Sequence, residues 1–340
     1  MAQSIAEAAT KCRVSGVTRL GILGAGAVAR HHAAAAHALG LQVSAAVTRS
    51  VESPRWQTFK DIAPEARHLS EGTDLLADPD VDAVVACLPW NVMPAWLDRL
   101  LAYDKPVLFE KPIALDSRTL KDAVDKCSAT GSRRQVGFNR RYYETVCRLA
   151  KRISQGGLKA AQITISEDID SHVAKHGAEV IPHLLAFASC HSLDLALHLF
   201  GPLRPVAIRV YPEHGVPRPF LSYNGLLETA AGIPISLALN ASDPSPAGIR
   251  CLFDDHTTWV LSPIEVLAVF EGYDIVPETA ERAIRSYRPR LVEEIVVDSR
   301  LKPGFVDQMR AFCTGEIGPG ATIEQATKLM DLIDAIEARV

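Results

Sequence analysis

The sequence lacks the features of several classes of protein. No apolar run approaches the roughly 20 residues that a membrane-spanning helix needs. Basic side chains are not in excess, since 36 Lys and Arg stand against 40 Asp and Glu, and this balance does not attract nucleic acid or an anionic membrane. Residues 1–16 hold acidic and polar side chains without a continuous apolar core, so we expect no signal peptide. Nucleic acid and membranes are therefore not expected as partners.

The cysteines also lack a pattern. The 7 cysteines include no C-x-x-C pair and their number is odd, which favours reduced thiols in a cytoplasmic protein. The 48% hydrophobic and 22% charged content is ordinary for a globular protein. The chain has 340 residues, and single hydrophobic cores stop growing at roughly 250–300, so we expect two domains.

Residues 1–138 carry the pattern of an α/β domain. Short apolar runs alternate with longer segments of helical period, which is typical of repeated βαβ units and a parallel sheet. We therefore predict a doubly wound, dinucleotide-binding Rossmann domain. The expected strands are Leu20–Leu23, Gln42–Val47, a weaker one near His68, Ala83–Cys87, Pro106–Glu110 and Gln135–Phe138, and the expected helices are Val28–Leu39, Pro94–Ala102 and Ser117–Ala129.

Residues 139–340 predict an α+β domain for substrate binding and oligomerisation. Ile163 and Ile165 alternate with polar residues, as in a strand with one buried face. We expect a large, mostly antiparallel open sheet that helices cover only in part, and such a half-covered sheet favours self-association. The expected elements are a helix at Tyr142–Gln155, strands at Ala161–Glu167, Pro205–Val210, Ile233–Leu239, Ile249–Phe253, Thr257–Leu261 and Leu291–Val297, and a helix from a capping box at Thr322 and Gln325 to Ala338.

A glycine-rich turn follows the first strand. In Gly24-Ala25-Gly26-Ala27-Val28-Ala29, Gly24 permits a tight turn, Gly26 lets the backbone approach a pyrophosphate, and Ala29 allows close packing of helix on strand. The helix that begins here presents free N–H groups and a positive dipole end to phosphates. Such a turn can also be a structural loop, but its place at the start of the first βαβ unit favours a nicotinamide dinucleotide.

The end of the second strand predicts which dinucleotide is bound. NAD-specific domains usually carry an acidic residue there, whereas this chain has Thr48-Arg49-Ser50. Arg49 can clamp a 2′-phosphate, and the two hydroxyl groups can donate hydrogen bonds to it. We expect NADP(H) to be preferred over NAD(H), although Arg49 can also be read as a solvated loop residue.

Three further motifs follow the glycine turn in order. They are Glu110-Lys111-Pro112, Gly137-Phe-Asn-Arg140-Arg-Tyr142 and His191-Ser-Leu-Asp194. With them the chain resembles the glucose-fructose oxidoreductase / inositol dehydrogenase (Gfo/Idh/MocA) family over nearly its whole length. The resemblance implies a pyridine-nucleotide oxidoreductase acting on CH–OH groups of polyols, cyclitols or keto-sugars, assembled as a homodimer or homotetramer.

The resemblance also implies roles for individual residues. Lys111 and His191 are the expected catalytic residues, because an ammonium stabilises alkoxide charge and an imidazole relays the accompanying proton. Lys111, Arg140, Tyr142, His191 and Asp194 are expected to bind substrate, with surface ion pairing as an equal alternative for Arg140 and Tyr142. The expected cofactor-binding residues are Gly24, Gly26, Ala27, Val28, Ala29, Thr48, Arg49, Ser50, Leu88, Pro89, Trp90, Glu110 and Lys111.

The chain departs from the family at Phe187, where many members carry an Asp four residues before the histidine. An apolar ring cannot carry a proton. Either Lys111 and His191 suffice, or a group such as His183 or Asp170 substitutes, or the chemistry is imine reduction or a redox-neutral reaction with retained cofactor. A dinucleotide-sensing regulator is the other alternative, which the retained Lys111 and His191 argue against.

Two histidine patterns could suggest further sites. His191, Asp194 and His198 lie on one helical face, but an isolated helix is weak evidence for a metal, so none is expected. His172 and His176 fall in a polar stretch, Ser171 to Gly177, that predicts a loop. The leading hypothesis is an NADP(H)-dependent oxidoreductase that interconverts a secondary alcohol and a ketone on a sugar-like or cyclitol-like molecule, whose identity depends on loops such as Gly215–Asn224.

Overall fold

A computed structural model describes residues 17–127, 131–212, 221–241, 243–316 and 318–338. The chain divides into two compact units. The first consists of Met1–Tyr142 and Asp298–Asp331, and the second of Tyr143–Val297 and Leu332–Val340. A segment near the C-terminus therefore packs with the first unit, and the domain limits expected at residues 138 and 139 stay a prediction.

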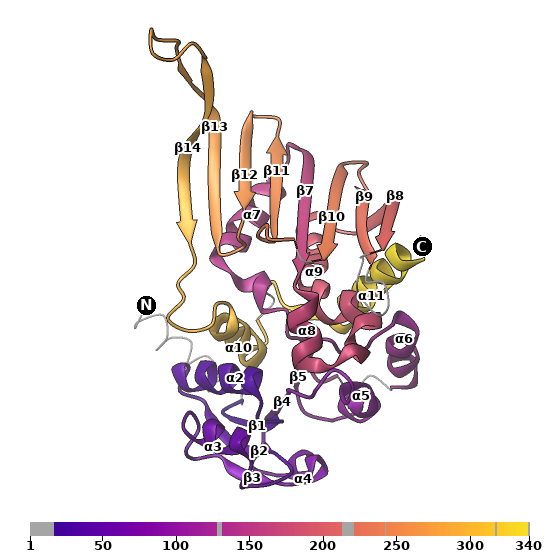
Figure 1. Cartoon of the computed structure of the whole chain (residues 1–340). Helices are drawn as coiled ribbons and strands as arrows, with labels where there is room; N and C mark the ends of the chain where they lie inside the picture. The colour runs from indigo at the N-terminus through magenta and orange to yellow at the C-terminus, as the bar shows by residue number, and fades with distance from the viewer. Residues whose placement is uncertain (1–16, 128–130, 213–220, 242, 317, 339–340) are drawn as a thin grey trace. The chain divides into compact units, whose positions relative to one another are not determined.

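The first unit contains a mostly parallel sheet (Figure 1). Its order is β15-β6-β5-β4-β1-β2-β3, in which β15 is antiparallel to β6 and the other neighbours are parallel. The expected Rossmann-type sheet is confirmed. Its strands are β1 (Arg19–Leu23), β2 (Gln42–Val47), β3 (Arg67–Leu69), β4 (Ala83–Ala86), β5 (Val107–Phe109), β6 (Arg134–Val136) and β15 (Ala321–Thr322).

Helix α2 connects the glycine turn to the core of this unit. Its buried face consists of small side chains such as Ala29, Ala33 and Ala36, so the helix lies close to the sheet and to α10. From α10, Phe305 and Phe312 fill the same core. Burying one such side chain stabilises the folded state by about 1.5–3 kcal/mol, so the contact with α10 helps to hold α2 in place. The helices of the first unit are α2 (Ala27–Ala38), α3 (Pro54–Lys60), α4 (Gly72–Ala77), α5 (Met93–Leu101), α6 (Ser117–Lys126) and α10 (Phe305–Thr314).

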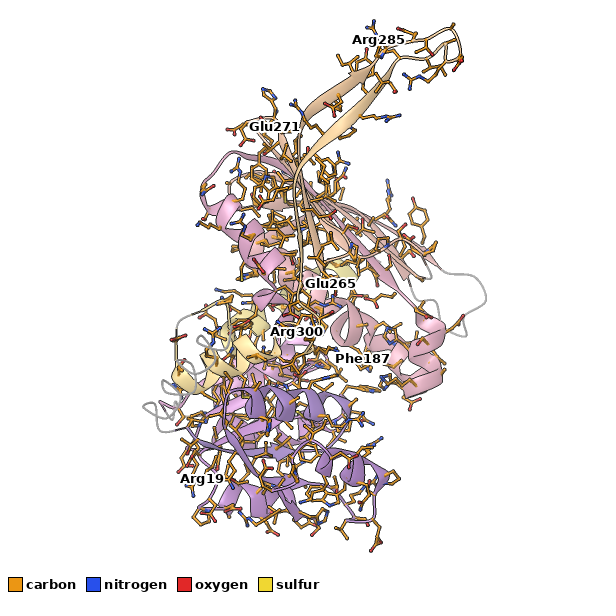
Figure 2. The ribbon with its side chains drawn as sticks, turned by 90° about the vertical axis from the view of Figure 1, so that its left-hand side faces the viewer. Arg19, Phe187, Glu265, Glu271, Arg285 and Arg300 are labelled. Atoms are coloured by element: carbon orange, nitrogen blue, oxygen red, sulfur yellow. The ribbon has the colours of Figure 1, made fainter. Side chains whose placement is uncertain are left out.

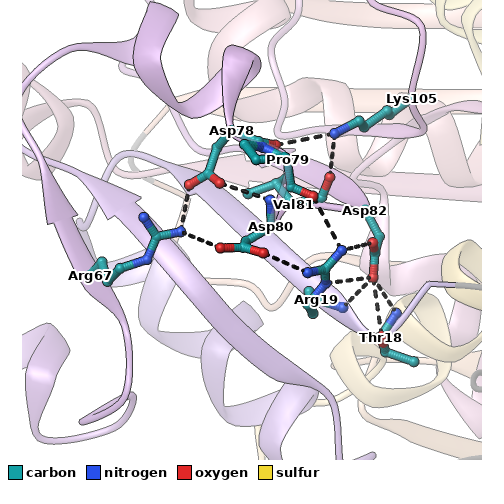
Figure 3. Close-up of polar contacts among 9 residues, drawn as sticks. All are labelled: Thr18, Arg19, Arg67, Asp78, Pro79, Asp80, Val81, Asp82 and Lys105. Carbon is teal, nitrogen blue, oxygen red and sulfur yellow. Dashed lines mark hydrogen bonds and ion pairs between the residues drawn. The ribbon is translucent and has the colours of Figure 1, made fainter.

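Polar contacts connect the starts of β1 and β4 (Figure 3). Asp82 accepts hydrogen bonds from the backbone N–H groups of Thr18 and Arg19, from the Thr18 hydroxyl and from the Arg19 guanidinium. Asp80 meets Arg19 at 2.8 Å and Arg67 at 3.8 Å. The side chain of Asp82 is 19% exposed and that of Asp80 is 61% exposed. The two carboxylates share Arg19 but differ in burial, so substitution of Asp80 is a control for substitution of Asp82.

We expect Asp82→Asn to lower the free energy of unfolding by about 1–3 kcal/mol at neutral pH, because several donors lose a charged acceptor. Burial raises the pKa of Asp82, but hydrogen bonds from Arg19 and Thr18 outweigh it and hold the pKa below its ordinary value. A lowered pKa contributes stability above the unfolded value of about 3.9, and this stability is lost as the pH falls through the folded pKa. In urea unfolding, the free energy of unfolding of Asp82→Asn should therefore be lower than that of wild type at pH 7, and this difference should shrink below about pH 4.

Asp80→Asn is the control, and it should change stability by less than about 1 kcal/mol because exposed ion pairs contribute little. An Asp82→Asn deficit that is the same at pH 7 and pH 3 would contradict the role given to the carboxylate.

The second unit contains an eight-stranded sheet of order β14-β13-β12-β11-β7-β10-β9-β8 (Figure 1). The β7–β10 pair is parallel and the other neighbours are antiparallel, which confirms the mostly antiparallel sheet. Its strands are β7 (Leu158–Glu167), β8 (Leu203–Pro212), β9 (Leu221–Thr229), β10 (Pro234–Ala241), β11 (Gly248–Phe253), β12 (Thr257–Leu261), β13 (Val266–Val276) and β14 (Ser286–Val296).

Several expectations for the later part of the chain need correction. The stretch expected as a loop, Ser171 to Gly177, lies almost wholly in helix α8 (Ile169–His176), which Asp168 caps by accepting a hydrogen bond from the Ser171 N–H. Strands β9 and β13 were not expected. Of the substrate loop expected at Gly215–Asn224, residues 215–220 lie outside the described residues and 221–224 belong to β9.

Helix α7 contacts strands β12 and β13 of this sheet, and α7 also contacts α9, the helix that carries His191. The capping box is confirmed, because Thr322 and Gln325 exchange two hydrogen bonds of 3.2 Å. Among the described residues, no helix has both the length and the apolar character needed to cross a membrane. The remaining helical elements are η1 (Asn139–Tyr142), α7 (Glu144–Ser154), α8 (Ile169–His176), η2 (Ala178–His183), the π-helical η3 (Leu185–Ser189), α9 (Cys190–Phe200) and α11 (Ile323–Glu337).

Candidate active site

The glycine turn has a backbone that only glycine adopts easily at its first position. Gly24 has φ +110°, and a Cβ there would lie 2.6 Å from the carbonyl oxygen of Cys87. Both facts exclude a side chain. The Cys87 N–H donates to the carbonyl of Leu23, so the ends of β1 and β4 are joined directly below the turn. Burial raises the pKa of the Cys87 thiol, and the Glu110 carboxylate adds to this, so Cys87 stays a neutral thiol.

Gly26 leaves space at the start of α2. It is the N-cap residue, no side chain caps the helix, and no acidic residue lies in its first turn. A Cβ at Gly26 would meet no atom within 4 Å, and its φ of −75° is accessible to any residue. No described residue therefore requires glycine at this position, whereas a phosphate approaching the uncapped N–H groups does. The turn fits a dinucleotide.

The end of β2 places its three candidate residues in different environments. The Thr48 hydroxyl is 2.9 Å from both the Ser50 carbonyl and His68 Nε2, and the Ser50 hydroxyl accepts from the Glu52 N–H. Both hydroxyls thus stabilise the loop. Arg49 is exposed, and its guanidinium has no ion pair within the part of the chain that the structure describes. It is the free cation of this loop.

The loops after β4 and β5 complete this edge of the sheet. Leu88 and Trp90 are half-buried and Pro89 is exposed, with its carbonyl accepting from the N–H groups that begin α5. Because β2, β1, β4 and β5 are neighbours and parallel, their carboxyl ends meet at one edge. The structure therefore brings the expected cofactor residues together within the first unit, where open α/β sheets bind ligands.

Glu110 is anchored beneath the Lys111 loop. Its N–H donates to the Ala86 carbonyl, and its Oε1 lies 2.7 Å from Nε2 of His32, an internal residue of α2. A Cβ on Gly137 would lie 2.7 Å from the same oxygen, so Gly137 makes room for the carboxylate. Both side chains of the pair are buried. His32 was not among the residues expected to be functional, although a histidine within an alanine-rich buried helix face is a signal.

The Asn139–Tyr142 turn serves mainly to attach the C-terminal segment to the first unit. Asn139 donates to the Pro303 carbonyl, and Arg141 donates to Gln325 and to the Pro319 carbonyl. Tyr142 is 7% exposed and its hydroxyl accepts from Gln135. Arg140 is half-buried. The substrate roles expected of Arg140 and Tyr142 stay predictions.

In the second unit, His191 lies in the first turn of α9 and is half-buried. Asp194, three residues further on, is 1% exposed. Phe187 precedes the helix in the π-helical turn η3. Its ring contacts the rings of His172 and His176, with centroids 5.6 Å and 4.8 Å away. The described residues contain no group of three or more His, Cys, Asp or Glu side chains that could hold a metal ion.

A parallel sheet whose strand β1 leads into this turn and helix is typical of dinucleotide-binding domains, and comparison with known proteins gives the family. A profile described as "Oxidoreductase family, NAD-binding Rossmann fold" matches residues 18–138. The chain is 34% identical over 297 residues to the inositol 2-dehydrogenase of Agrobacterium fabrum, covering 82% of this chain and 84% of that protein. It is 29% identical over 189 residues to the inositol 2-dehydrogenase of Acidothermus cellulolyticus, covering 54% of this chain and 53% of that protein.

A solved structure shows the same fold. The UDP-N-acetylglucosamine 3-dehydrogenase of Acidithiobacillus ferrooxidans superposes with a TM-score of 0.72 at 17% identity, over 95% of this chain and 97% of that chain. The chain belongs to the Gfo/Idh/MocA family of oxidoreductases. The expectation of an NAD(P)-dependent oxidoreductase acting on CH–OH groups is thereby confirmed at the level of the family.

Proposed function

We propose that this chain is an NADP(H)-dependent dehydrogenase or reductase that interconverts a secondary alcohol and a ketone on a cyclitol-like or sugar-like molecule. The observation that carries the proposal is the similarity to the Agrobacterium inositol 2-dehydrogenase over most of both chains. The dinucleotide supplies hydride transfer when bound. Gly24 to Ala29 would hold its pyrophosphate, Lys111 would stabilise charge on the reacting oxygen, and His191 would hold that oxygen or handle its proton.

This function is tested by measuring hydride transfer between the cofactor and a panel of candidate substrates. Inositol isomers, aldoses and their keto derivatives are offered with NADP(H) and with NAD(H), and the absorbance of the reduced nicotinamide is followed. We expect turnover with at least one cyclitol or sugar. Tight NADPH binding without turnover of any of these compounds would count against the proposal and favour a sensing role.

The preference for NADP(H) is proposed from Arg49. We expect Arg49→Ala to weaken NADPH binding by about 10- to 100-fold, because charge-assisted hydrogen bonds contribute about 1.5–3 kcal/mol. NADH affinity should change by less than about threefold, since NADH has no 2′-phosphate. Binding is measured by fluorescence titration of the reduced nicotinamides. Equal losses for NADPH and NADH would contradict the assignment.

Arg99→Ala is the matched control for Arg49→Ala. Arg99 is another exposed arginine of the first unit, in the last turn of α5, where it lies over the ring of Trp96. Helix α5 begins after β4 and leads away from the carboxyl edge of the sheet, so the variant should bind both nucleotides as wild type does.

Self-association is proposed for the second unit, with a second copy of the chain as the partner. The strands β13 and β14 extend beyond the rest of the sheet, from near Glu271 to Arg285 at the tip (Figure 2). Exposed apolar side chains lie along this hairpin: Tyr273, Ile275, Ile284, Tyr287, Leu291, Val292 and Val296. An exposed hairpin with many apolar side chains favours association with another protein surface, so light scattering should give the mass of a dimer or tetramer. The cytoplasmic location expected from the cysteines also stays a proposal.

A further inference from the structure

A buried acid lies at the carboxyl end of β7. Glu167 is the last residue of the strand and is 9% exposed. Its Oε1 accepts a hydrogen bond of 2.8 Å from the buried Ser189 hydroxyl, and its Oε2 lies 3.3 Å from Nε2 of His172. A buried carboxylate is tolerated only with such partners, because burial penalises the charge. Glu167 is therefore held in place by two neighbours that come from different helical elements.

His172 is the more accessible member of the cluster. Its side chain is 27% exposed, whereas that of Glu167 is 11% exposed. The contact with the carboxylate favours the tautomer with hydrogen on Nε2, which leaves a lone pair on Nδ1. Within the described residues, Nδ1 makes no hydrogen bond to the protein. A carboxylate that orients an imidazole in this way, with the other ring nitrogen open, is the arrangement of a general base.

One partner of Glu167 stands close to His191 in the sequence. Ser189, the partner of Glu167, ends η3 and stands two residues before His191 in the sequence. Phe187 in η3 packs its ring edge-on against His172, with an interplanar angle of 87°, and Figure 2 shows Phe187 among the helices of the second unit. Single π-helical turns occur frequently at functional sites. The ring of Phe187 thus packs against the His172 imidazole and restricts its orientation.

We propose that His172, held by Glu167, is the general base of the reaction, an inference that rests on the function proposed above. In alcohol oxidation, Nδ1 takes the hydroxyl proton and the electron pair of the O–H bond forms the C=O bond. The electron pair of the C–H bond leaves as hydride to the nicotinamide ring of the oxidised cofactor. The imidazolium is balanced by Glu167 and later loses its proton to water, while His191 remains a hydrogen-bond partner of the same oxygen.

This assignment answers the question posed by Phe187. Of the two alternatives expected from the sequence, His183 is half-buried in η2 and Asp170 is exposed in the first turn of α8, whereas His172 contacts a buried carboxylate. The two oxygens of Glu167 contact Ser189 and His172. His172 is therefore the imidazole that a buried carboxylate orients.

The experiment combines kinetics with a measurement that needs no turnover. We expect His172→Ala to lower kcat by about 10²- to 10⁴-fold, as loss of a general base does, with unchanged NADPH affinity. Free imidazole in the assay should restore part of the rate, which a purely structural role would not allow. Glu167→Gln should give an intermediate loss. In wild type, nitrogen-15 spectra of labelled histidines should show His172 with its hydrogen on Nε2.

His176→Ala is the matched control, because its imidazole packs on the same Phe187 ring from the same helix. Its kcat should stay within about fivefold of the wild-type value, so a loss of kcat equal to that of His172→Ala would overturn the proposal. Hydrogen on Nδ1 of His172, or full activity in His172→Ala, would do the same. Absence of wild-type turnover on the whole panel is a different result: it overturns the proposed function, and the base assignment with it.

Discussion

Lys111→Met is expected to lower kcat by about 10²- to 10⁴-fold while NADPH binds within about threefold of its wild-type affinity. The lysine follows β5 at the carboxyl edge of the sheet, and its neighbour Glu110 is anchored by His32 and by the Ala86 backbone. A cation in a fixed loop stabilises alkoxide charge that develops only during the reaction, so its loss falls on the chemical step. Steady-state kinetics with the best substrate of the panel, together with fluorescence titration of NADPH, give the two quantities.

Lys126→Met serves as the control for Lys111→Met. Lys126 is an exposed lysine in the last turn of α6, in the same unit, and the variant loses an equal charge. Its kinetics should match those of wild type. If Lys111→Met turns over at the wild-type rate, Lys111 has no part in the mechanism.

Substitution by alanine should affect two glycines of one turn differently, changing nucleotide binding at Gly26 and protein stability at Gly24. Gly26→Ala is expected to weaken dinucleotide binding by about 100-fold or more and to change the free energy of unfolding by less than about 1 kcal/mol. The added methyl meets no protein atom within 4 Å, so it occupies only the space through which the pyrophosphate approaches. Isothermal titration with NADPH and thermal unfolding without nucleotide measure the two effects.

Gly24→Ala is expected to destabilise the protein itself. Its φ of +110° is strained for any residue with a Cβ, and that atom would lie 2.6 Å from the Cys87 carbonyl oxygen. Strained backbone costs about 1–3 kcal/mol, and the close contact adds to this, so the unfolding temperature of the apoprotein should fall by several degrees. Equal stability of the Gly24→Ala and Gly26→Ala proteins would contradict the division of roles between the two glycines.

The elements that the sequence analysis missed share physical causes. Helices α3 and α4 are seven and six residues long, which is too short for a helical period to stand out. Strand β13 has irregular pairing between Val269 and Tyr273, and such a bulge interrupts the alternation of buried and exposed residues. In β9, Gly225 lies against the Ala207 carbonyl of β8, a close approach that its sequence does not announce.

Features that depend on residues close together in the chain could be predicted from the sequence. The run from an apolar strand through Gly24 and Gly26 into a helix predicted the dinucleotide turn, and Thr322 with Gln325 predicted a helix start, because backbone geometry and capping act within a few residues. The motif order pointed to the family that the comparisons show.

The pairing of buried polar side chains became known from the folded chain. His32 and Glu110 are 78 residues apart, and Glu167 and Ser189 are 22 apart, yet each pair is buried and in contact. The folded chain also has Asp298–Asp331 in the first unit and a helix in place of the loop expected around His172. Such pairings follow from how strands and helices pack over long sequence distances, where burial makes a polar partner obligatory without any local pattern that names it.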